Sequence, residues 1–480
     1  MRRWLWVAVG ASLLPVYLAT LAPSITWANL GTDSGDLVTA AAVSGVAHPT
    51  GYPTYLLLVR LVQFVPLGTL AYRANLLSAF ATALSSGLIC YLVQAAYRGA
   101  PVWGQAGGVL AGMSFGLAPL VWSQAVIAEV YALHALFIVV LLLALLPANV
   151  TPAWDWLGGL ALGLGLGNHL TLALLAPAWL VLSAWRGKGL NARAAFRSLA
   201  GMSIGLLIYL YLPLRAAAQP PINWGNAANW QGFWWVVSAA PYRANVFGLP
   251  VAALPQRLQA LGQQFAIQAG GLGLALAGTG LLAGWWGRAP RVWALTLWTA
   301  IVSLVFATGY NTAGWLVYLL PVVLALAIWS GLGLAWWLEE AATRLTKRLA
   351  VLAVAACVIA LWVAAVRHLP GVDASRDRRA EAFARTVLNQ APQGAMIFTN
   401  SDTDTFPLWY FHFAEGARPD VIIVVKGLLS FDWYRQELQA AYGPLVLPEE
   451  WTLGWKVNIG ARNARPVCET LPDSTQVLVC

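Results

Sequence analysis

Long apolar segments, each interrupted by a few polar or charged residues, make up most of the first 366 positions. Apolar runs of roughly 17 residues or more are typical of membrane-spanning helices, because a helix needs about that length to cross the hydrocarbon core. The pattern therefore predicts a polytopic α-helical membrane protein. Eleven spans are expected, at 4–21, 73–97, 103–123, 130–147, 156–169, 170–186, 197–214, 263–286, 291–308, 314–337 and 349–366.

The apolar segment 52–67 is ambiguous, because it is short, contains Arg60 and is bounded by Pro53 and Pro66. If it crossed the membrane, every later loop would change sides. If it lies along the outer surface, 12 basic residues fall in cytoplasmic loops and 5 in external loops before the final domain. Cytoplasmic loops are enriched in Lys and Arg. A juxtamembrane helix on the outer side, with the N-terminus cytoplasmic, is therefore predicted.

From about residue 370 the pattern changes to that of a soluble α/β domain, with helices expected at 374–390, 405–414 and 431–441 and strands at 395–399 and 421–425. We expect a transmembrane domain over 1–369 and a soluble domain over 370–480. An odd number of spans places the second domain outside. There, Cys468 and Cys480 could pair in an oxidising compartment, although their spacing does not demand it.

Composition supports the membrane assignment and excludes several other classes. The chain is 59% hydrophobic and 10% charged, whereas soluble domains carry about 25% charged residues. The net charge of +9 is spread along short loops and does not form one basic patch, so it indicates loop orientation and not nucleic-acid binding. Spans rich in Gly, Ala, Leu and Trp with few Met favour a bacterial inner membrane.

Acidic residues are scarce in the first 366 positions, and their placement is informative. The six carboxylates there are Asp33, Asp36, Glu129, Asp155, Glu339 and Glu340. The last three are expected on the cytoplasmic side, as solvated helix ends. The first three are all expected on the outer side. This segregation indicates a site at the outer membrane face.

Asp33 and Asp36 share the short loop 31–36 ahead of an apolar run. Either Ser34 or Asp36 could cap the helix that follows, whereas Asp33 lies too far upstream for a routine cap. A carboxylate that is partly shielded from water can act as a general base toward a hydroxyl group. A second carboxylate nearby could raise the pKa of the first or hold a metal ion.

Other polar residues are expected to reach the same side. His48 follows the two Asp residues, and Glu129 lies between two apolar spans, where an unpaired charge is costly. An external arginine can bind a lipid phosphate in a bidentate manner, although snorkelling explains such residues equally well. The further candidates are Tyr52, Asn168, His169, Arg215, Asn223, Trp224, Arg243 and Asn311.

Seven short motifs, taken in order, resemble the protein O-mannosyltransferase-like family of the GT-C superfamily of membrane glycosyltransferases. They are TDSGD (32–36), HPTGYP (48–53), RANLLS (73–78), AEVY (128–131), GNHLT (167–171), PPINWG (220–225) and DTDTFPLWY (402–410). Each motif is weak alone, but the ordered set covers most of the chain. Asp36 stands where relatives commonly have Glu, and Thr50 where they commonly have Pro.

The resemblance implies a GT-C fold, a first external loop with two juxtamembrane helices, and a polyprenyl-phosphate-linked sugar as donor. Asp33 matches the catalytic Asp of the family and is expected to be the general base, with Asp36 as a second catalytic carboxylate. His48, Glu129, His169, Arg215 and Arg243 are expected to bind the donor and its phosphate. Tyr52, Asn168, Asn223, Trp224 and Asn311 are expected to bind substrate.

The predicted reaction is an inverting transfer of a hexose, mannose being the first candidate, to a hydroxyl of a protein, glycan or lipid acceptor at the outer membrane face. No motif requires a cofactor, and a divalent metal remains open. The alternatives are a transporter or lipid flippase with an external sensing domain, or a catalytically inactive scaffold. A transporter should carry ionisable groups at mid-membrane, and none of the six carboxylates is expected there.

Overall fold

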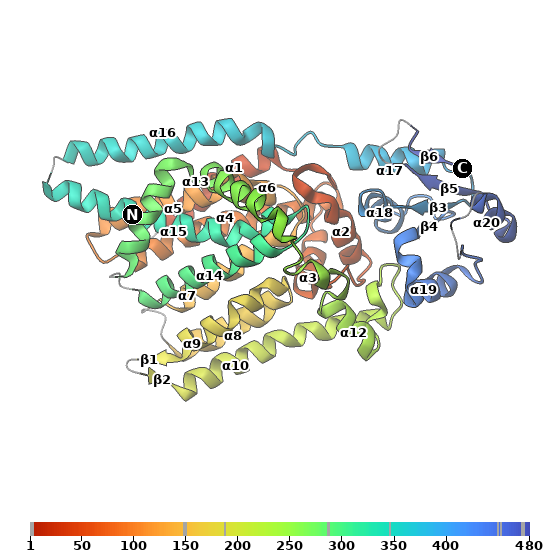
Figure 1. Cartoon of the computed structure of the whole chain (residues 1–480), viewed down its shortest axis with the longest axis horizontal. Helices are drawn as coiled ribbons and strands as arrows, with labels where there is room; N and C mark the ends of the chain where they lie inside the picture. The colour runs from red at the N-terminus through yellow and green to blue at the C-terminus, as the bar shows by residue number, and fades with distance from the viewer. Residues whose placement is uncertain are drawn as a thin grey trace.

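A computed structural model describes residues 4–146, 151–186, 189–285, 289–344, 347–448, 451, 454–471 and 476–480. Most of these residues form helices that lie side by side in one body, and a smaller mixed domain covers one end of it (Figure 1). The start of α1 (Leu5–Thr20) lies at the end of the body far from the C-terminal domain. The two ends of the chain therefore occupy opposite sides of the helical layer.

The helical body contains sixteen labelled helices among the described residues. They are α1, α2 (Ser34–Ala42), α3 (Pro53–Gln63), α4 (Leu70–Ala96), α5 (Pro101–Leu117), α6 (Pro119–Ala125), α7 (Val130–Ala144), α8 (Pro152–Leu166), α9 (Ala176–Ala184), α10 (Ala192–Leu206), α11 (Tyr211–Ala216), α12 (Trp230–Val237), α13 (Leu254–Trp285), α14 (Pro290–Gly309), α15 (Leu320–Arg344) and α16 (Lys347–Val372). A two-strand hairpin, β1 (Trp185–Arg186) and β2 (Gly189–Leu190), joins α9 to α10.

Six helical segments in the described part of the chain are long and apolar enough to cross a membrane, and a bent pair makes up to seven. Each of the eleven predicted spans overlaps at least one helix, but the spans 103–123, 170–186 and 197–214 are each divided among several helical segments, and α1 and α7 are shorter apolar helices. The polytopic helical fold is confirmed, whereas the count of eleven spans stays a prediction.

The predicted span 103–123 is not one straight helix. The structure divides it into α5 and α6, which meet at an angle of 65°. Ala118, between them, has extended backbone angles, and Pro119 begins α6. Proline lacks the N–H that a continuous helix would use and clashes with the preceding turn, which explains the break.

The carboxylates predicted to be solvated helix ends are not free in water. Asp155 is only 4% exposed, and its Oδ2 accepts hydrogen bonds of 3.0 and 2.8 Å from the guanidinium of Arg197. Glu339 is half-buried and accepts hydrogen bonds from the Ala100 N–H and the Tyr97 hydroxyl. The prediction failed because these partners are distant in sequence. The predicted cytoplasmic residues Arg2, Arg3, Lys188 and Arg288, and the interfacial Trp286, lie outside the described residues.

The first external segment contains two short helices, α2 and α3. At 11 residues α3 is too short to cross a membrane, as predicted for the segment 52–67. Pro53 begins the helix, where a missing N–H costs nothing. Tyr55 and Leu56 are fully buried, and Arg60 donates a 2.7 Å hydrogen bond to the Ala42 carbonyl. The two helices therefore pack against each other and against the body.

The C-terminal domain is a four-stranded sheet with helices around it. Its elements are α17 (Arg379–Gln390), β3 (Met396–Thr399), α18 (Asp402–Trp409), β4 (Ile422–Val425), α19 (Asp432–Tyr442), α20 (Trp455–Asn463), β5 (Val467–Thr470) and β6 (Leu478–Val479). The strand order is β4-β3-β5-β6, with β6 alone antiparallel. The predicted helices and strands of this domain are confirmed, and α20, β5 and β6 were not foreseen.

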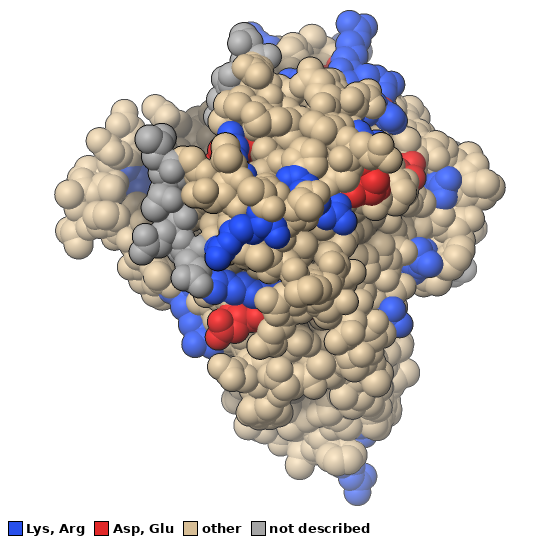
Figure 2. Space-filling view, turned by 90° about the vertical axis from the view of Figure 1, so that its right-hand side faces the viewer, with Lys and Arg blue, Asp and Glu red and all other residues tan. Residues whose placement is uncertain are grey.

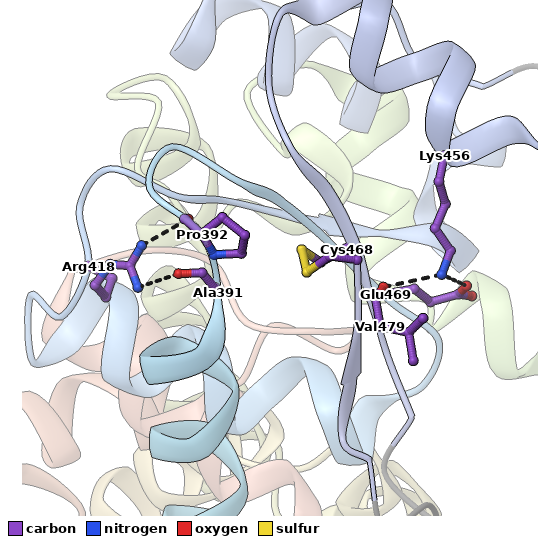
Figure 3. The surroundings of a disulfide bond; sticks show 8 residues. Ala391, Pro392, Arg418, Lys456, Cys468, Glu469 and Val479 are labelled. Carbon is purple, nitrogen blue, oxygen red and sulfur yellow. Dashed lines mark hydrogen bonds and ion pairs between the residues drawn. A yellow bond between two sulfur atoms is a disulfide. The ribbon is translucent and has the colours of Figure 1, made fainter.

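A disulfide joins Cys468 on β5 to Cys480 at the end of the sheet (Figure 3). Beside it, the Lys456 ammonium bridges the Glu469 carboxylate at 3.4 Å and the Val479 carbonyl at 3.2 Å. These contacts connect α20 to the two strands that the disulfide links. The edge of the sheet is thereby fixed covalently and by charge.

Charged residues are distributed differently over the two parts of the molecule. Figure 2 views the end that carries the C-terminal domain and shows acidic side chains interspersed among basic ones. Several form ion pairs, such as Arg418 with Asp420 at 2.8 Å and Lys426 with Glu469 at 2.6 Å. This mixed surface is typical of a domain exposed to water.

The C-terminal domain packs directly on the first external segment. At Gly35 an added Cβ would lie 2.6 Å from the Phe406 carbonyl oxygen, so the backbones of α2 and α18 touch. One buried hydrophobic cluster includes Leu37, Val38, Phe406 and Trp409. The domain therefore forms part of the wall around the loop that carries the two Asp residues.

Candidate active site

Asp36 lies in the first turn of α2 with its side chain fully buried. Its Oδ2 accepts hydrogen bonds from the backbone N–H of His48 at 3.0 Å and from His48 Nδ1 at 2.7 Å. Its Oδ1 accepts a bond of 3.1 Å from Trp224 Nε1. The carboxylate thus ties the first external loop to the loop after α11. Since it is sealed from solvent, it orients its neighbours and does not itself face a substrate.

His48 lies between the two carboxylates. One ring nitrogen contacts Asp36, and the other, Nε2, is 3.7 Å from the Asp33 Oδ2. Phe406 stacks on the imidazole with a centroid distance of 6.2 Å and an interplanar angle of 17°. Burial lowers the pKa of His48, but the negative charges of Asp33 and Asp36 outweigh it and raise the pKa to about 9. His48 is therefore an imidazolium at neutral pH.

Asp33 is the exposed member of the group formed by Asp36, His48 and Asp33. Its side chain is 44% exposed, in contrast to those of Asp36 and His48. It occupies the residue before α2 but makes no capping hydrogen bond, so helix capping does not explain it. Its surroundings raise its pKa, first through desolvation and then through the charge of Asp36, while His48 opposes the shift. Such a carboxylate is both reachable and more basic than an ordinary Asp.

Glu129 is buried at the start of α7, and its Oε1 has no hydrogen-bond partner among the described residues. Desolvation, and then the charge of Asp33, raise its pKa well above the ordinary value. Asp33 and Glu129 therefore lie close enough for the charge of Asp33 to affect the pKa of Glu129. A buried polar atom without a partner is rare and needs an explanation.

A second polar series begins at His169. Its Nδ1 is 2.7 Å from the Thr171 hydroxyl, which lies 3.5 Å from His134 Nε2. The His169 ring also lies between Tyr52, at 6.3 Å, and Tyr318, at 6.0 Å. Tyr52 in turn contacts the His48 ring edge-on at 5.0 Å. Tyr52 thus contacts both His48, in the group with the two Asp residues, and His169, in the group with Thr171 and His134.

A cavity of about 280 Å³ opens beside these rings. Tyr52, His169 and Arg243 line it together with aromatic and aliphatic side chains. Arg243 makes hydrogen bonds only to Ser238 among the described residues, so its guanidinium retains donors facing the cavity side. A mostly apolar pocket with one cation suits an amphiphile with an anionic head.

The structure does not bring every predicted site residue to this cavity. Arg215 donates a 2.7 Å hydrogen bond to the Ser44 carbonyl and does not line the cavity. Asn311 is exposed beyond it. Asn168 is buried and donates to the Val130 carbonyl at 3.1 Å. Trp224 reaches Asp36 and not the cavity, and the neighbouring Asn223 is buried without a side-chain partner.

Several residues near the site were not among the predicted site residues. Phe406 contacts His48, and Tyr242 and Tyr318 line the cavity. Asp402, at the start of α18, has its pKa raised to about 6, first by burial and then by Asp33. The motif 402–410 pointed to a role for the external domain but not to this contact. No periodic or spacing signal connects the remaining residues to Asp33.

The described residues contain no group of three or more His, Cys, Asp or Glu side chains arranged to hold a metal ion. The described geometry therefore provides no ready-made metal centre beside Asp33.

Comparison with known families agrees with the motifs. Residues 33–191 match the family model described as the protein O-mannosyl-transferase TMEM260 N-terminal domain, and residues 380–454 match TMEM260-associated domain 2. A curated mouse (Mus musculus) protein O-mannosyl-transferase TMEM260 is 30% identical over 465 residues, covering 89% of this chain and 63% of the relative. A Dictyostelium discoideum protein O-mannosyl-transferase is 22% identical, covering 88% and 57%. The chain thus spans about three fifths of the length of these relatives.

Solved structures share the fold. ArnT from Cupriavidus metallidurans bound to undecaprenyl phosphate superposes with a TM-score of 0.56 at 16% identity, covering 89% of this chain and 90% of that chain. The oligosaccharyltransferase AglB from Archaeoglobus fulgidus, in complex with an inhibitory peptide and a dolichol-phosphate, gives 0.52 at 11% identity, covering 98% and 69%. The family models and curated relatives confirm the predicted resemblance to O-mannosyltransferase-like proteins, and the solved structures show the same fold.

Proposed function

We propose that this multi-pass membrane protein is a glycosyltransferase that moves a hexose, most simply mannose, from a polyprenyl-phosphate donor to a hydroxyl group of a protein or glycan. One observation carries the proposal. Asp33 is an exposed carboxylate whose neighbour, His48, is held in place by the fully buried Asp36. The O-mannosyl-transferase names of the relatives support the reaction class.

In the proposed reaction, Asp33 accepts the proton of the acceptor hydroxyl. The acceptor oxygen forms a bond to the anomeric carbon of the donor from the face opposite the phosphate. The bond from that carbon to the phosphate oxygen breaks, and its electron pair leaves with the polyprenyl phosphate. The configuration is inverted, and no covalent sugar–enzyme intermediate forms. The raised pKa of Asp33 favours this role, because a stronger base takes the proton more completely.

Charge on the leaving phosphate requires cationic or hydrogen-bonding partners. Arg243 is the better phosphate-binding candidate, because it lines the cavity of about 280 Å³ and Arg215 does not. His48 contributes a further positive charge near Asp33, and His169 contributes a ring nitrogen that can form a hydrogen bond to the phosphate. Such preorganised groups stabilise the transition state by electrostatics. The lipid phosphates named with ArnT and AglB support this class of donor.

Asp36 and Glu129 have supporting roles in this proposal. Asp36 is a positioning residue that fixes the ring orientation of His48 and keeps it protonated. Glu129 has a carboxyl oxygen without a partner among the described residues, and desolvation raises its pKa, so we assign it a hydrogen bond to a sugar hydroxyl. Tyr52 lies between both parts of the site and is placed to contact the sugar.

The site is proposed to face the side of the membrane opposite the cytosol. The disulfide between Cys468 and Cys480 supports this orientation, because disulfides persist mainly in oxidising compartments. The C-terminal domain contacts the loop of Asp33, so both must be on that side. The prediction of a bacterial inner membrane rests on composition alone, and the two relatives come from a mouse and Dictyostelium discoideum.

The replacement Asp33→Asn tests the base. In purified protein reconstituted into lipid vesicles with polyprenyl-phosphate [³H]mannose and a hydroxyl-bearing peptide, we expect transfer to fall by about 10²- to 10⁴-fold. Donor binding should persist, because the amide keeps the shape of the side chain. Asp373→Asn, an exposed acid after α16, is the matched control. Transfer at the wild-type rate in Asp33→Asn would refute the assignment, and movement of intact donor across the bilayer would indicate a flippase.

A further inference from the structure

A second cavity, of about 390 Å³, lies between the membrane body and the C-terminal domain. One wall is the loop around residues 219–226, and the other is formed by α19 and the end of α18. Its size falls within the range of pockets that bind small ligands. The proposed transfer reaction does not use it.

Four aromatic residues are among those that line this cavity. Trp409 and Phe413 come from α18 and the turn after it, and Tyr434 and Tyr442 come from α19. Trp409 and Tyr434 are buried, whereas Phe413 and Tyr442 are only partly covered. Flat aromatic rings with a polar edge suit ligands that have one apolar face and hydroxyl groups at the rim.

Neutral hydrogen-bonding groups surround these rings. Gln219 and Asn226 lie on the loop side, and Gln436 and Glu437 lie on α19. Amide side chains provide both donors and acceptors. The described lining residues include no lysine or arginine, so the cavity offers no charge partner for a phosphate or a carboxylate.

One buried polar atom of the cavity lining has no partner. Oε1 of Glu437 is buried without a hydrogen bond of normal geometry among the described residues. The side chain of Asn223, which is 4% exposed and lies outside the lining, is the neighbouring polar group and stabilises the ionised form of Glu437. Burial raises the pKa of Glu437 to about 8, so the group is mostly neutral at pH 7 and carries an O–H donor. Buried groups of this kind require a ligand or ordered water.

We propose that this cavity, between the 219–226 loop and α19, is a carbohydrate-binding site for a short neutral oligosaccharide. A sugar ring would stack on the exposed parts of Phe413 and Tyr442. Its hydroxyls would pair with Gln436, Glu437 and the amides opposite. A ligand with both donors and acceptors and no charge matches this lining, whereas an anionic lipid or nucleotide does not.

The cavity is separate from the transfer site, although the two share a wall. The Trp409 ring lines the cavity and lies 6.1 Å from the Trp224 ring. Trp224 in turn donates to Asp36 on its other side. A bound oligosaccharide would therefore rest against the same aromatic pair that supports the acidic loop. It would anchor a glycan without occupying the cavity that contains Arg243.

Binding can be measured on the full chain in lipid nanodiscs by saturation-transfer NMR and calorimetry, with mannobiose as the probe. We expect saturable binding to wild type, weakened at least several-fold in Gln436→Ala, Glu437→Gln and Tyr442→Ala. Gln439→Ala, an exposed position of α19 outside the lining, is the matched control and should bind as wild type. Asp33→Asn should also bind as wild type, even though it fails to transfer sugar.

The Asp33→Asn arm separates this proposal from the transferase proposal. Mannobiose binding that disappears in Asp33→Asn, or that persists unchanged in all three cavity variants, would place the sugar elsewhere and overturn the inference. An absence of saturable binding to wild type, or preferential binding of a neutral peptide that the three cavity variants weaken, would also overturn it. Gln436 is exposed, so its replacement tests the site without removing a buried side chain.

Discussion

Two buried aspartates in the membrane half show how the same residue serves different purposes. Asp155 accepts two hydrogen bonds from the guanidinium of Arg197, which lies on a neighbouring helix. Asp36 binds an imidazole, a backbone N–H and an indole, and the imidazole leads on to the exposed Asp33. The ion pair of Asp155 with Arg197 holds two helices together. The contacts that run from Asp36 through His48 end at Asp33, an exposed carboxylate that can react. Partners, more than burial, distinguish structural carboxylates from functional ones.

The largest expected effect is on stability, at the ion pair of Asp155 with Arg197. Arg197→Ala removes the guanidinium that binds the buried carboxylate of Asp155, and removal of one partner of such a pair costs about 3–5 kcal/mol. Thermal unfolding should shift to markedly lower temperature, while transfer per folded molecule is kept. The double variant Asp155→Asn with Arg197→Ala should recover part of the loss. A loss of transfer without a loss of stability would contradict the comparison.

His48 should couple stability to pH. Its folded pKa of about 9 exceeds the ordinary value of 6.5, so its contribution is fully present below pH 6.5 and is lost as the pH rises through about 9. At about 1.36 kcal/mol per pKa unit, the total is roughly 3 kcal/mol. Thermal unfolding of wild type and His48→Asn should therefore differ most near pH 6 and converge above pH 9. A stability difference between wild type and His48→Asn that does not change with pH would show that folding does not raise the pKa of His48.

Asp36→Asn should affect activity more than stability. The amide keeps the shape of the side chain but removes the charge that holds His48 protonated. We expect transfer to fall by about 100-fold, or roughly 2.7 kcal/mol, and the alkaline limit of the pH–rate profile to move to lower pH. A merely structural role would lower the amount of folded protein and leave the profile in place. The comparison is with Asp155→Asn, whose profile should not move.

The smallest expected effect is at Trp224. Replacement by Phe keeps an aromatic ring but removes the 3.1 Å hydrogen bond to Asp36. One lost hydrogen bond to a charged group costs about 1.5–3 kcal/mol, and the lower end applies because two donors remain. Transfer should drop by about tenfold, with the pH profile shifted in the same direction as in Asp36→Asn. An effect as large as that of Asp33→Asn would mean that Trp224 contacts substrate.

Sequence reasoning placed Asp33, His48 and Glu129 on one side of the membrane from the loop charges, and the structure brings these three residues close together. It misjudged Asp155, because its partner Arg197 is 42 positions away and belongs to another helix. It also treated α5 and α6 as one span, although Pro119 was a visible signal for a break. Phe406 could not be assigned to His48, since no local pattern reveals a contact across 358 positions.

The close fit of Gly35 against Phe406 has a practical consequence for anyone who shortens this protein. Cutting the chain before the external domain would do more than delete a module, because it would uncover the imidazole face that Phe406 shields. Water would then reach the carboxylate pair from behind and screen the charges that keep His48 protonated. A truncated chain that still inserts into lipid would therefore present an acidic loop with altered basicity, and its inactivity would say little about which domain performs the chemistry.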